Sequence, residues 1–180
     1  MAYTICLLPG DGIGPEVIAS AEQVLKVLKL DLHFIRADIG YGAYQTHGTP
    51  LPEATLQTIR TSHATLLGAV TTPPNIPGYF SPIVRMRQNL DLYANLRPCR
   101  SIKHPSSRPG IDMVIVRENT EGEYSSVGGR MFAGTDREFV IQESVFTRHG
   151  TDRVLRYAFE LARQRTGKLT SATKSNGISI

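Results

Sequence analysis

The sequence is poor in cysteine and contains neither a long apolar run nor a cluster of basic residues. Cys6 and Cys99 are its only cysteines; they have no motif spacing, which predicts free thiols in a reducing compartment. The longest apolar runs, such as ATLLGAV at 64–70, are too short to span a bilayer. The start, MAYTICLLPGDG, lacks a basic segment followed by a long apolar stretch, so no signal peptide is predicted. We therefore expect a cytoplasmic protein without membrane contact.

The charge balance favours a small anionic ligand over nucleic acid. The 20 basic and 16 acidic residues give a net charge of +4, and no run of lysine or arginine suggests a nucleic-acid surface. The apolar content of 41% and charged content of 20% are ordinary for a globular protein, and 180 residues suit one domain or a small pair.

The first half of the chain alternates between strand and helix patterns. Short apolar segments at 3–8, 31–37 and 63–70 read as strands, and Pro15 and Pro52 open helices between them. This order predicts a parallel α/β sheet. In the first helix one apolar stripe repeats at helical spacing: Val17, Ala21, Val24 and Leu28.

The second half has a different character. After a proline-rich loop at 71–79 come a short helix at 82–90, a strand within LDLYANLRPCR and a strand at 111–116. Residues 103–110 (KHPSSRPG) are interpreted as a linker, which predicts domains at 1–102 and 103–180. Turn signals and alternating side chains predict an antiparallel hairpin within 122–145. A helix over 151–164 and a last strand, KLTSAT at 168–173, follow.

The glycine turn formed by Gly10, Gly12 and Gly14 is weak support for a nucleotide site. Its spacing is not that of the dinucleotide fingerprint, because Pro15 stands where that fingerprint continues. A tight turn that only glycine can form is the preferred interpretation.

Three arginines at the ends of predicted elements are candidates for an anion clamp: Arg87, Arg97 and Arg117. A single arginine is more often a solvated surface charge. Arg117, however, ends an apolar strand, so its charge needs a partner or a cavity. Guanidinium groups bind carboxylates through paired hydrogen bonds, and three together would hold a di- or tricarboxylate.

Tyr124 and Lys174 could supply proton transfer beside such a clamp. Taken alone, Tyr124 suits packing and Lys174 suits a surface amine; together they offer the phenol and the amine needed to move protons around an enolate. The five histidines show no metal-ligand spacing.

Five stretches resemble one enzyme family, the β-decarboxylating dehydrogenases that act on isocitrate, isopropylmalate, homoisocitrate, tartrate and D-malate. They are PGDGIGPEV, HATLLGAV, LDLYANLRP, VIVRENTEGEYSS and TKSNG, in this order. The second half resembles the tartrate/D-malate branch most, and the first hundred residues resemble the homoisocitrate and isopropylmalate branches. The resemblance implies an isopropylmalate-dehydrogenase-like fold, incomplete here: part of a parallel-sheet large domain and part of a small domain whose arm, 122–145, clasps a second subunit in a homodimer.

The resemblance also assigns roles to matching positions. It implies that the three arginines hold the substrate carboxylates and that Tyr124 protonates the enol after carbon dioxide leaves. It also implies that Lys174, reaching across from the partner subunit, assists removal of the hydroxyl proton. The implied cofactors are NAD and Mg²⁺ or Mn²⁺. The positions implied to lie beside NAD are Ala69, Val70, Thr71, Thr72 and Asn176.

The helix before the clamp is implied to recognise the group on the third carbon of the substrate. Phe80, Ile83 and Val84 are apolar there, which favours D-malate, tartrate or isopropylmalate-type substrates. Arg85, next to Val84, keeps a homoisocitrate substrate open. Isocitrate enzymes place polar groups at these positions and resemble the pattern less, and a homoisocitrate/isocitrate dehydrogenase is the alternative.

Members of this family are about twice as long, and no D-x-x-x-D pair is present on a late helix. We expect the metal ligands in a C-terminal half and expect the 180 residues alone to be inactive. Two other hypotheses stay open: a non-catalytic subunit that keeps the clamp, and an unrelated α/β binding module.

Overall fold

The computed structural model describes residues 2–74, 76 and 78–173. The chain forms two compact units, Met1–Asp91 and Leu92–Ile180. The division falls earlier than the boundary expected after residue 102, and residues 103–110 connect two paired strands within the second unit. The assignment of these units to a large and a small domain stays a prediction.

The first unit is built on a parallel sheet, as the alternation of elements predicts. Strands β1 (Tyr3–Gly10), β2 (Leu32–Arg36) and β3 (Ala64–Ala69) pair in the order β2-β1-β3, and both pairings are parallel. The carboxyl ends of all three strands therefore lie at one edge of the sheet, where open α/β sheets place ligands.

The centre of this unit is the apolar run of β1. Cys6 and Leu8 point to one face and join a buried cluster with Leu56 of α3 (Glu53–Thr61) and Met86 of α4 (Pro82–Asn89). Leu7 points to the opposite face and is fully buried as well. Burial raises the pKa of the Cys6 thiol, which is consistent with a structural cysteine.

Helix α1 (Gly14–Val27) begins where Pro15 predicts, but the buried face differs from the predicted stripe. Val17, Val24 and Leu28 are exposed, whereas Gly14 and Ile18 are buried. The helix contacts β1 and β3. At Gly14 its backbone comes so close to β1 that a side chain there would overlap the carbonyl oxygen of Pro9. This close approach determines which face of α1 packs on the sheet.

Helix α2 (Tyr41–His47) was not predicted from the sequence. It is short, and Gly40 and Gly48 flank it with positive φ angles of 96° and 72°. Such a helix is marginal by itself, and its first backbone N–H groups are bound by a side chain from the glycine turn.

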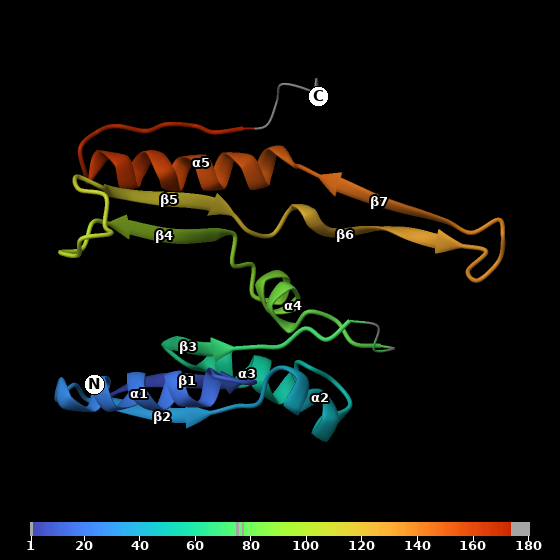
Figure 1. The fold of residues 1–180 in the computed structure, drawn as a ribbon, viewed down its shortest axis with the longest axis horizontal. Coiled ribbons are helices and arrows are strands. Elements are labelled where there is room, and N and C mark those ends of the chain that lie inside the picture. The colour runs from blue at the N-terminus through green and yellow to red at the C-terminus, as the bar shows by residue number, and fades with distance from the viewer. Residues whose placement is uncertain (1, 75, 77, 174–180) are drawn as a thin grey trace. The chain divides into compact units, whose positions relative to one another are not determined.

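The second unit contains two antiparallel pairs. Strand β4 (Ala94–Arg100) pairs with β5 (Asp112–Glu118), and β6 (Gly122–Met131) pairs with β7 (Phe139–Val145). The predicted hairpin at 122–145 is therefore confirmed, and it extends beyond the β4–β5 ladder (Figure 1).

Helix α5 (Arg148–Arg163) runs along β5 (Figure 1). It begins three residues before the predicted start at 151, because the Thr147 hydroxyl caps it by accepting a hydrogen bond from the Gly150 N–H. Ala158 and Ala162 form its buried side.

The predicted strand at 168–173 is wrong. These residues adopt no regular structure and pair with no described strand. The apolar pattern alone cannot form a strand, which needs a hydrogen-bonded neighbour. Among the described residues, no helix has the length and apolar character needed to cross a membrane.

We predict that alanine at Gly10 destabilises the protein far more than alanine at Gly48. Both glycines have a φ of 72°, but only a side chain at Gly10 would overlap the carbonyl oxygen of Ala69; nothing lies within 4 Å at Gly48. Gly48→Ala should cost about 1–2 kcal/mol from backbone strain. Gly10→Ala should cost more than about 3 kcal/mol, measured by urea unfolding. Equal losses would contradict the packing of the turn against β3.

Candidate active site

Two of the three predicted arginines share one face of the β4–β5 ladder. Asn95 lies opposite Arg117, and Arg97 lies opposite Ile115. Residues two apart on a strand share a face, so Arg97 and Arg117 are diagonal neighbours on the same side. The structure thus places Arg97 and Arg117 on one face of the same ladder within the second unit.

Arg117 lies over the ring of Tyr124, with its guanidinium carbon 5.6 Å from the ring centroid. The side chain of Arg117 is half-buried, and the ring gives its charge a favourable neighbour, a contact worth roughly 0.5–2 kcal/mol. Two predicted site residues from different strands are therefore in contact.

Asn95 and Asn119 form a polar link that the sequence analysis missed. Asn95 Oδ1 accepts a hydrogen bond from Arg97 Nε at 3.2 Å, and Asn95 Nδ2 donates to Asn119 Oδ1 at 3.4 Å. Asn119 is only 7% exposed and donates from Nδ2 to the carbonyl of Leu92 at 3.3 Å. Buried amides need such partners, and this link holds the Arg97 side chain on its face.

The turn between Arg117 and Tyr124 is held by the carboxylate of Glu118. It accepts hydrogen bonds from the Thr120 hydroxyl at 2.6 Å, from the Thr120 N–H at 3.0 Å and from the Glu121 N–H at 2.8 Å. Burial by itself would raise the pKa of Glu118, but these hydrogen bonds outweigh it and hold the pKa below its usual value.

Arg153 of α5 contacts the same turn. Its Nη2 donates to the Thr120 hydroxyl at 2.9 Å, and its guanidinium carbon lies 4.7 Å from the centre of the Tyr93 ring. Glu121 adds a second connection to α5, because its carboxylate accepts from both the N–H and the hydroxyl of Thr147, at 2.8 and 2.6 Å. The strand leading to Tyr124 is therefore fixed to the helix.

The third arginine, Arg87, lies in the last turn of α4 in the first unit and is half-buried. Its convergence with Arg97 and Arg117 stays a prediction. In the same helix Ile83 packs against the buried cluster, and Val84 is half-buried. Arg85 lies over the Phe80 ring at 5.4 Å.

The predicted cofactor loop follows β3 at the carboxyl edge of the sheet. Ala69 and Val70 are half-buried, with Val70 packed against the cluster, whereas Thr71 and Thr72 are exposed. The Thr71 N–H donates to the carboxylate of Asp11 at 2.8 Å. The sequence analysis missed Asp11, although an aspartate inside a glycine turn often binds nearby backbone N–H groups.

Lys174 and Asn176, the remaining predicted site residues, lie outside the described residues. Within residues 2–74, 76 and 78–173, no group of three or more histidine, cysteine, aspartate or glutamate side chains could hold a metal ion. The described part of the chain therefore does not fit a Mg²⁺ or Mn²⁺ site.

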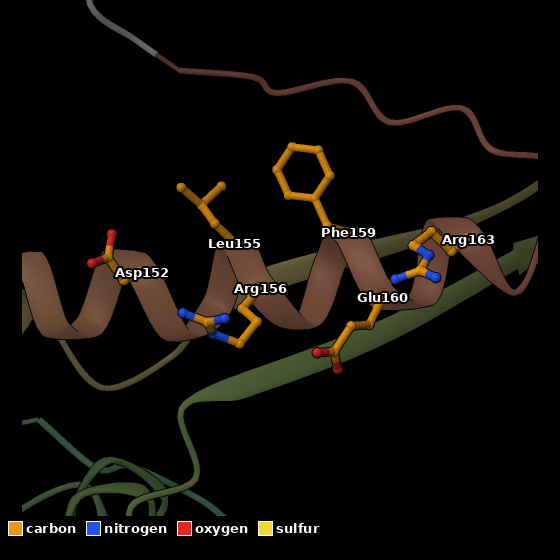
Figure 2. A pocket seen from close by; sticks show the side chains of 6 residues that line it. All are labelled: Asp152, Leu155, Arg156, Phe159, Glu160 and Arg163. Carbon is orange, nitrogen blue, oxygen red and sulfur yellow. The ribbon is translucent and has the colours of Figure 1, made fainter.

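A shallow groove of about 390 Å³ lies along α5, and none of its lining residues is a predicted site residue. Figure 2 shows Leu155 and Phe159 projecting from one side of the helix, with Arg156 and Glu160 on another. Its mixed apolar and charged lining resembles an ordinary helix surface.

We predict that Glu118→Gln lowers the free energy of unfolding at neutral pH and makes that free energy less dependent on pH in the acid range. The pKa of Glu118 is lowered in the folded state. The carboxylate therefore stabilises the fold at pH values above the pKa of the unfolded state, about 4.3, and this stabilisation is lost as the pH falls through the folded pKa. Loss of hydrogen bonds to this charged group should cost about 1–3 kcal/mol at pH 7. Unfolding by urea between pH 7 and pH 3 measures both effects.

Glu123→Gln is the matched control, because Glu123 is exposed in the neighbouring strand. It should follow the wild-type pH profile. A Glu118→Gln profile parallel to the wild type at every pH would contradict the assigned role.

The chain matches the family model for isocitrate/isopropylmalate dehydrogenase over residues 4–179. It is 44% identical to an isocitrate/homoisocitrate dehydrogenase of Thermus thermophilus over 98% of this chain and 52% of that protein. It is 45% identical to the decarboxylating D-malate dehydrogenase of Escherichia coli over 98% of this chain and 53% of that protein.

The crystal structure of isocitrate dehydrogenase from Methylococcus capsulatus superposes with a TM-score of 0.83 and 37% identity, over 90% of this chain and 48% of that one. This likeness confirms the expected α/β fold. The chain spans about half the length of the curated relatives that it matches. It belongs to the isocitrate/isopropylmalate dehydrogenase family.

Proposed function

We propose that the protein containing this chain is an NAD-dependent enzyme that oxidises and decarboxylates a malate-type 2-hydroxy acid. The observation that carries the proposal is that Arg97 and Arg117 share one face of the β4–β5 ladder and that Arg117 lies over the Tyr124 ring. This grouping combines carboxylate binding with a phenol, and relatives bear the names of decarboxylating dehydrogenases.

In this proposal the arginines bind and orient the substrate. Arg97 and Arg117 share one strand face, so their planar donors can hold two carboxylate groups of one molecule; Arg87 would complete the clamp. Fixing the substrate in this way contributes through orientation and preorganised charge. The Asn95–Asn119 link supports Arg97 through Asn95, and the hydrogen bonds of Glu118 hold the turn that follows Arg117.

Tyr124 and Lys174 carry the proton transfers. Lys174 would take the hydroxyl proton as the hydrogen at the second carbon leaves as hydride. NAD, when bound beside residues 69–72 and Asn176, supplies the acceptor for that hydride. Cleavage of the bond to the β-carboxylate releases carbon dioxide, and the electron pair left on the third carbon takes a proton from the Tyr124 hydroxyl.

The exposed Thr71 and Thr72 at the carboxyl edge of the sheet suit a cofactor loop. The described residues provide no ligand group for a divalent metal, and its ligands are expected in the C-terminal half of the full-length protein.

The apolar side chains on α4 favour a substrate whose third carbon carries no charged arm besides the β-carboxylate: D-malate, tartrate or 3-isopropylmalate. Ile83 and Val84 are both partly accessible. Homoisocitrate or isocitrate is the second candidate, supported by Arg85, which is exposed on the same helix, and by the name of the Thermus thermophilus relative. A non-catalytic subunit would keep the clamp but lack turnover.

We further propose that the enzyme is a homodimer with residues 122–145 as the clasping arm. Apolar side chains of β7, including Phe139, Val140 and Ile141, are exposed on this hairpin. Exposed apolar surface of this kind suits burial against a second copy.

The substrate class is tested with the full-length protein that contains this chain, NAD and Mn²⁺. We expect NADH formation with matched release of carbon dioxide from D-malate, tartrate or 3-isopropylmalate. Preference for homoisocitrate or isocitrate would support the second candidate. No NADH from any of these acids, with folded protein, would refute the proposed activity and favour a non-catalytic subunit.

Separate variants should distinguish binding from proton transfer. Arg117→Lys removes a paired carboxylate contact and should raise the KM for the hydroxy acid by roughly 10–100-fold. Tyr124→Phe removes the proton donor and should lower kcat by about 10²–10⁴-fold. Steady-state kinetics measure both.

Arg100→Lys is the matched control, because Arg100 lies on β4 and pairs with Asp112 at an exposed position. It should leave both constants within about twofold, as exposed ion pairs contribute little. Near-normal kcat in Tyr124→Phe would exclude Tyr124 as the proton donor.

A further inference from the structure

The carboxylate of Asp11 joins three segments of the first unit that are far apart in the sequence. Its Oδ2 accepts hydrogen bonds from the N–H groups of Tyr41 at 2.7 Å and Thr71 at 2.8 Å, and its Oδ1 accepts from the Gly42 N–H at 2.9 Å. The Asp11 N–H in turn donates to the carbonyl of Ala69 at 2.7 Å. One residue thus holds the glycine turn, the start of α2 and the loop after β3.

The same loop is held from a second direction. The Tyr79 hydroxyl donates to the carbonyl of Thr71 at 2.7 Å, so both backbone polar groups of Thr71 are bound by side chains. The Tyr79 ring packs against Tyr41 and Tyr44 of α2, with centroids 6.1 and 5.3 Å away. Burial, aided by the charge of Asp11, raises the pKa of Tyr79, which keeps its hydroxyl protonated as a donor.

These contacts form a closed circuit. The Asp11 carboxylate binds the start of α2, and Tyr44 of α2 packs against the Tyr79 ring. The Tyr79 hydroxyl binds the Thr71 carbonyl, and the Thr71 N–H binds the Asp11 carboxylate. The carboxylate has little room to move, because a side chain at Gly40 would overlap it. These contacts therefore restrain the backbone of Thr71 at both its N–H and its carbonyl group.

We propose that Asp11 and Tyr79 are positioning residues that hold the cofactor loop in the form that binds the dinucleotide. They act through the backbone of Thr71 and need not touch the ligand. Disruption of either bond should weaken dinucleotide binding more than hydroxy-acid binding, because residues 69–72 change and the β4–β5 ladder does not. This inference rests on the proposed function, in which these residues line the NAD site.

The test uses Asp11→Asn and Tyr79→Phe in the full-length protein. The asparagine keeps one acceptor oxygen but loses the charge, and the phenylalanine keeps the ring but loses the hydroxyl. We expect each to weaken NADH binding by about tenfold or more, measured by fluorescence titration, since one hydrogen bond to a charged or buried group is worth that factor. The KM for the hydroxy acid should stay within about twofold, and hydrogen exchange at the Thr71 amide should become faster.

Two matched controls lie in the same unit. Asp38→Asn changes an exposed carboxylate that pairs with His47, and Tyr3→Phe changes an exposed phenol whose ring contacts His63. Both should bind NADH as the wild type does. If Tyr79→Phe and a folded Asp11→Asn bind NADH normally and keep the Thr71 amide protected, the inference is overturned.

A general loss of stability gives a different pattern. It would raise the KM of both substrates together, and that outcome also overturns the inference. A wild-type protein that binds no NADH refutes the proposed function instead. In that case hydrogen exchange at the Thr71 amide still tests whether Asp11 and Tyr79 anchor the loop. Faster exchange in both variants supports the anchoring, and unchanged exchange overturns it.

Discussion

The part of the first unit that lies beyond the carboxyl ends of its strands depends on one carboxylate, that of Asp11. Backbone N–H groups at the start of α2 and in the loop after β3 would lose hydrogen-bonding partners on folding. Asp11 accepts from three of them at once. The sheet places the segments near one another, and this side chain determines how they connect.

The second unit uses acidic side chains in the same way. Glu118 binds the N–H groups of the turn after β5, and Glu121 binds the N–H and hydroxyl of Thr147 at the cap of α5. These carboxylates are engaged by backbone and hydroxyl donors, which explains why they serve as structural acceptors and form no metal-binding group among the described residues. These two carboxylates thereby shape the chain on the C-terminal side of Arg117.

The sequence predicts the features that depend on local patterns and misses those that depend on distant partners. The strands of the parallel sheet and the hairpin at 122–145 follow from apolar runs, alternation and glycine turns. Helix α2 was missed because it is stabilised by Asp11, which binds the Tyr41 N–H and lies thirty residues earlier in the chain. The predicted stripe on α1 was displaced by the close approach at Gly14. Residues 168–173 have the composition of a strand but no described partner.

For the site, the Arg117–Tyr124 contact follows from the turn that joins their strands. The supporting role of Asn119 could not be predicted, because a single asparagine in a sequence does not reveal its hydrogen-bond partners.

The two thiols differ in a way that makes the molecule convenient to label. Cys6 is fully buried in β1 with its pKa raised, so little thiolate is available to an alkylating reagent. Cys99 is partly accessible and shares the strand face of Arg97. Of these two thiols, a maleimide spin label or fluorophore will therefore couple at Cys99, and the label will lie on the strand face of Arg97.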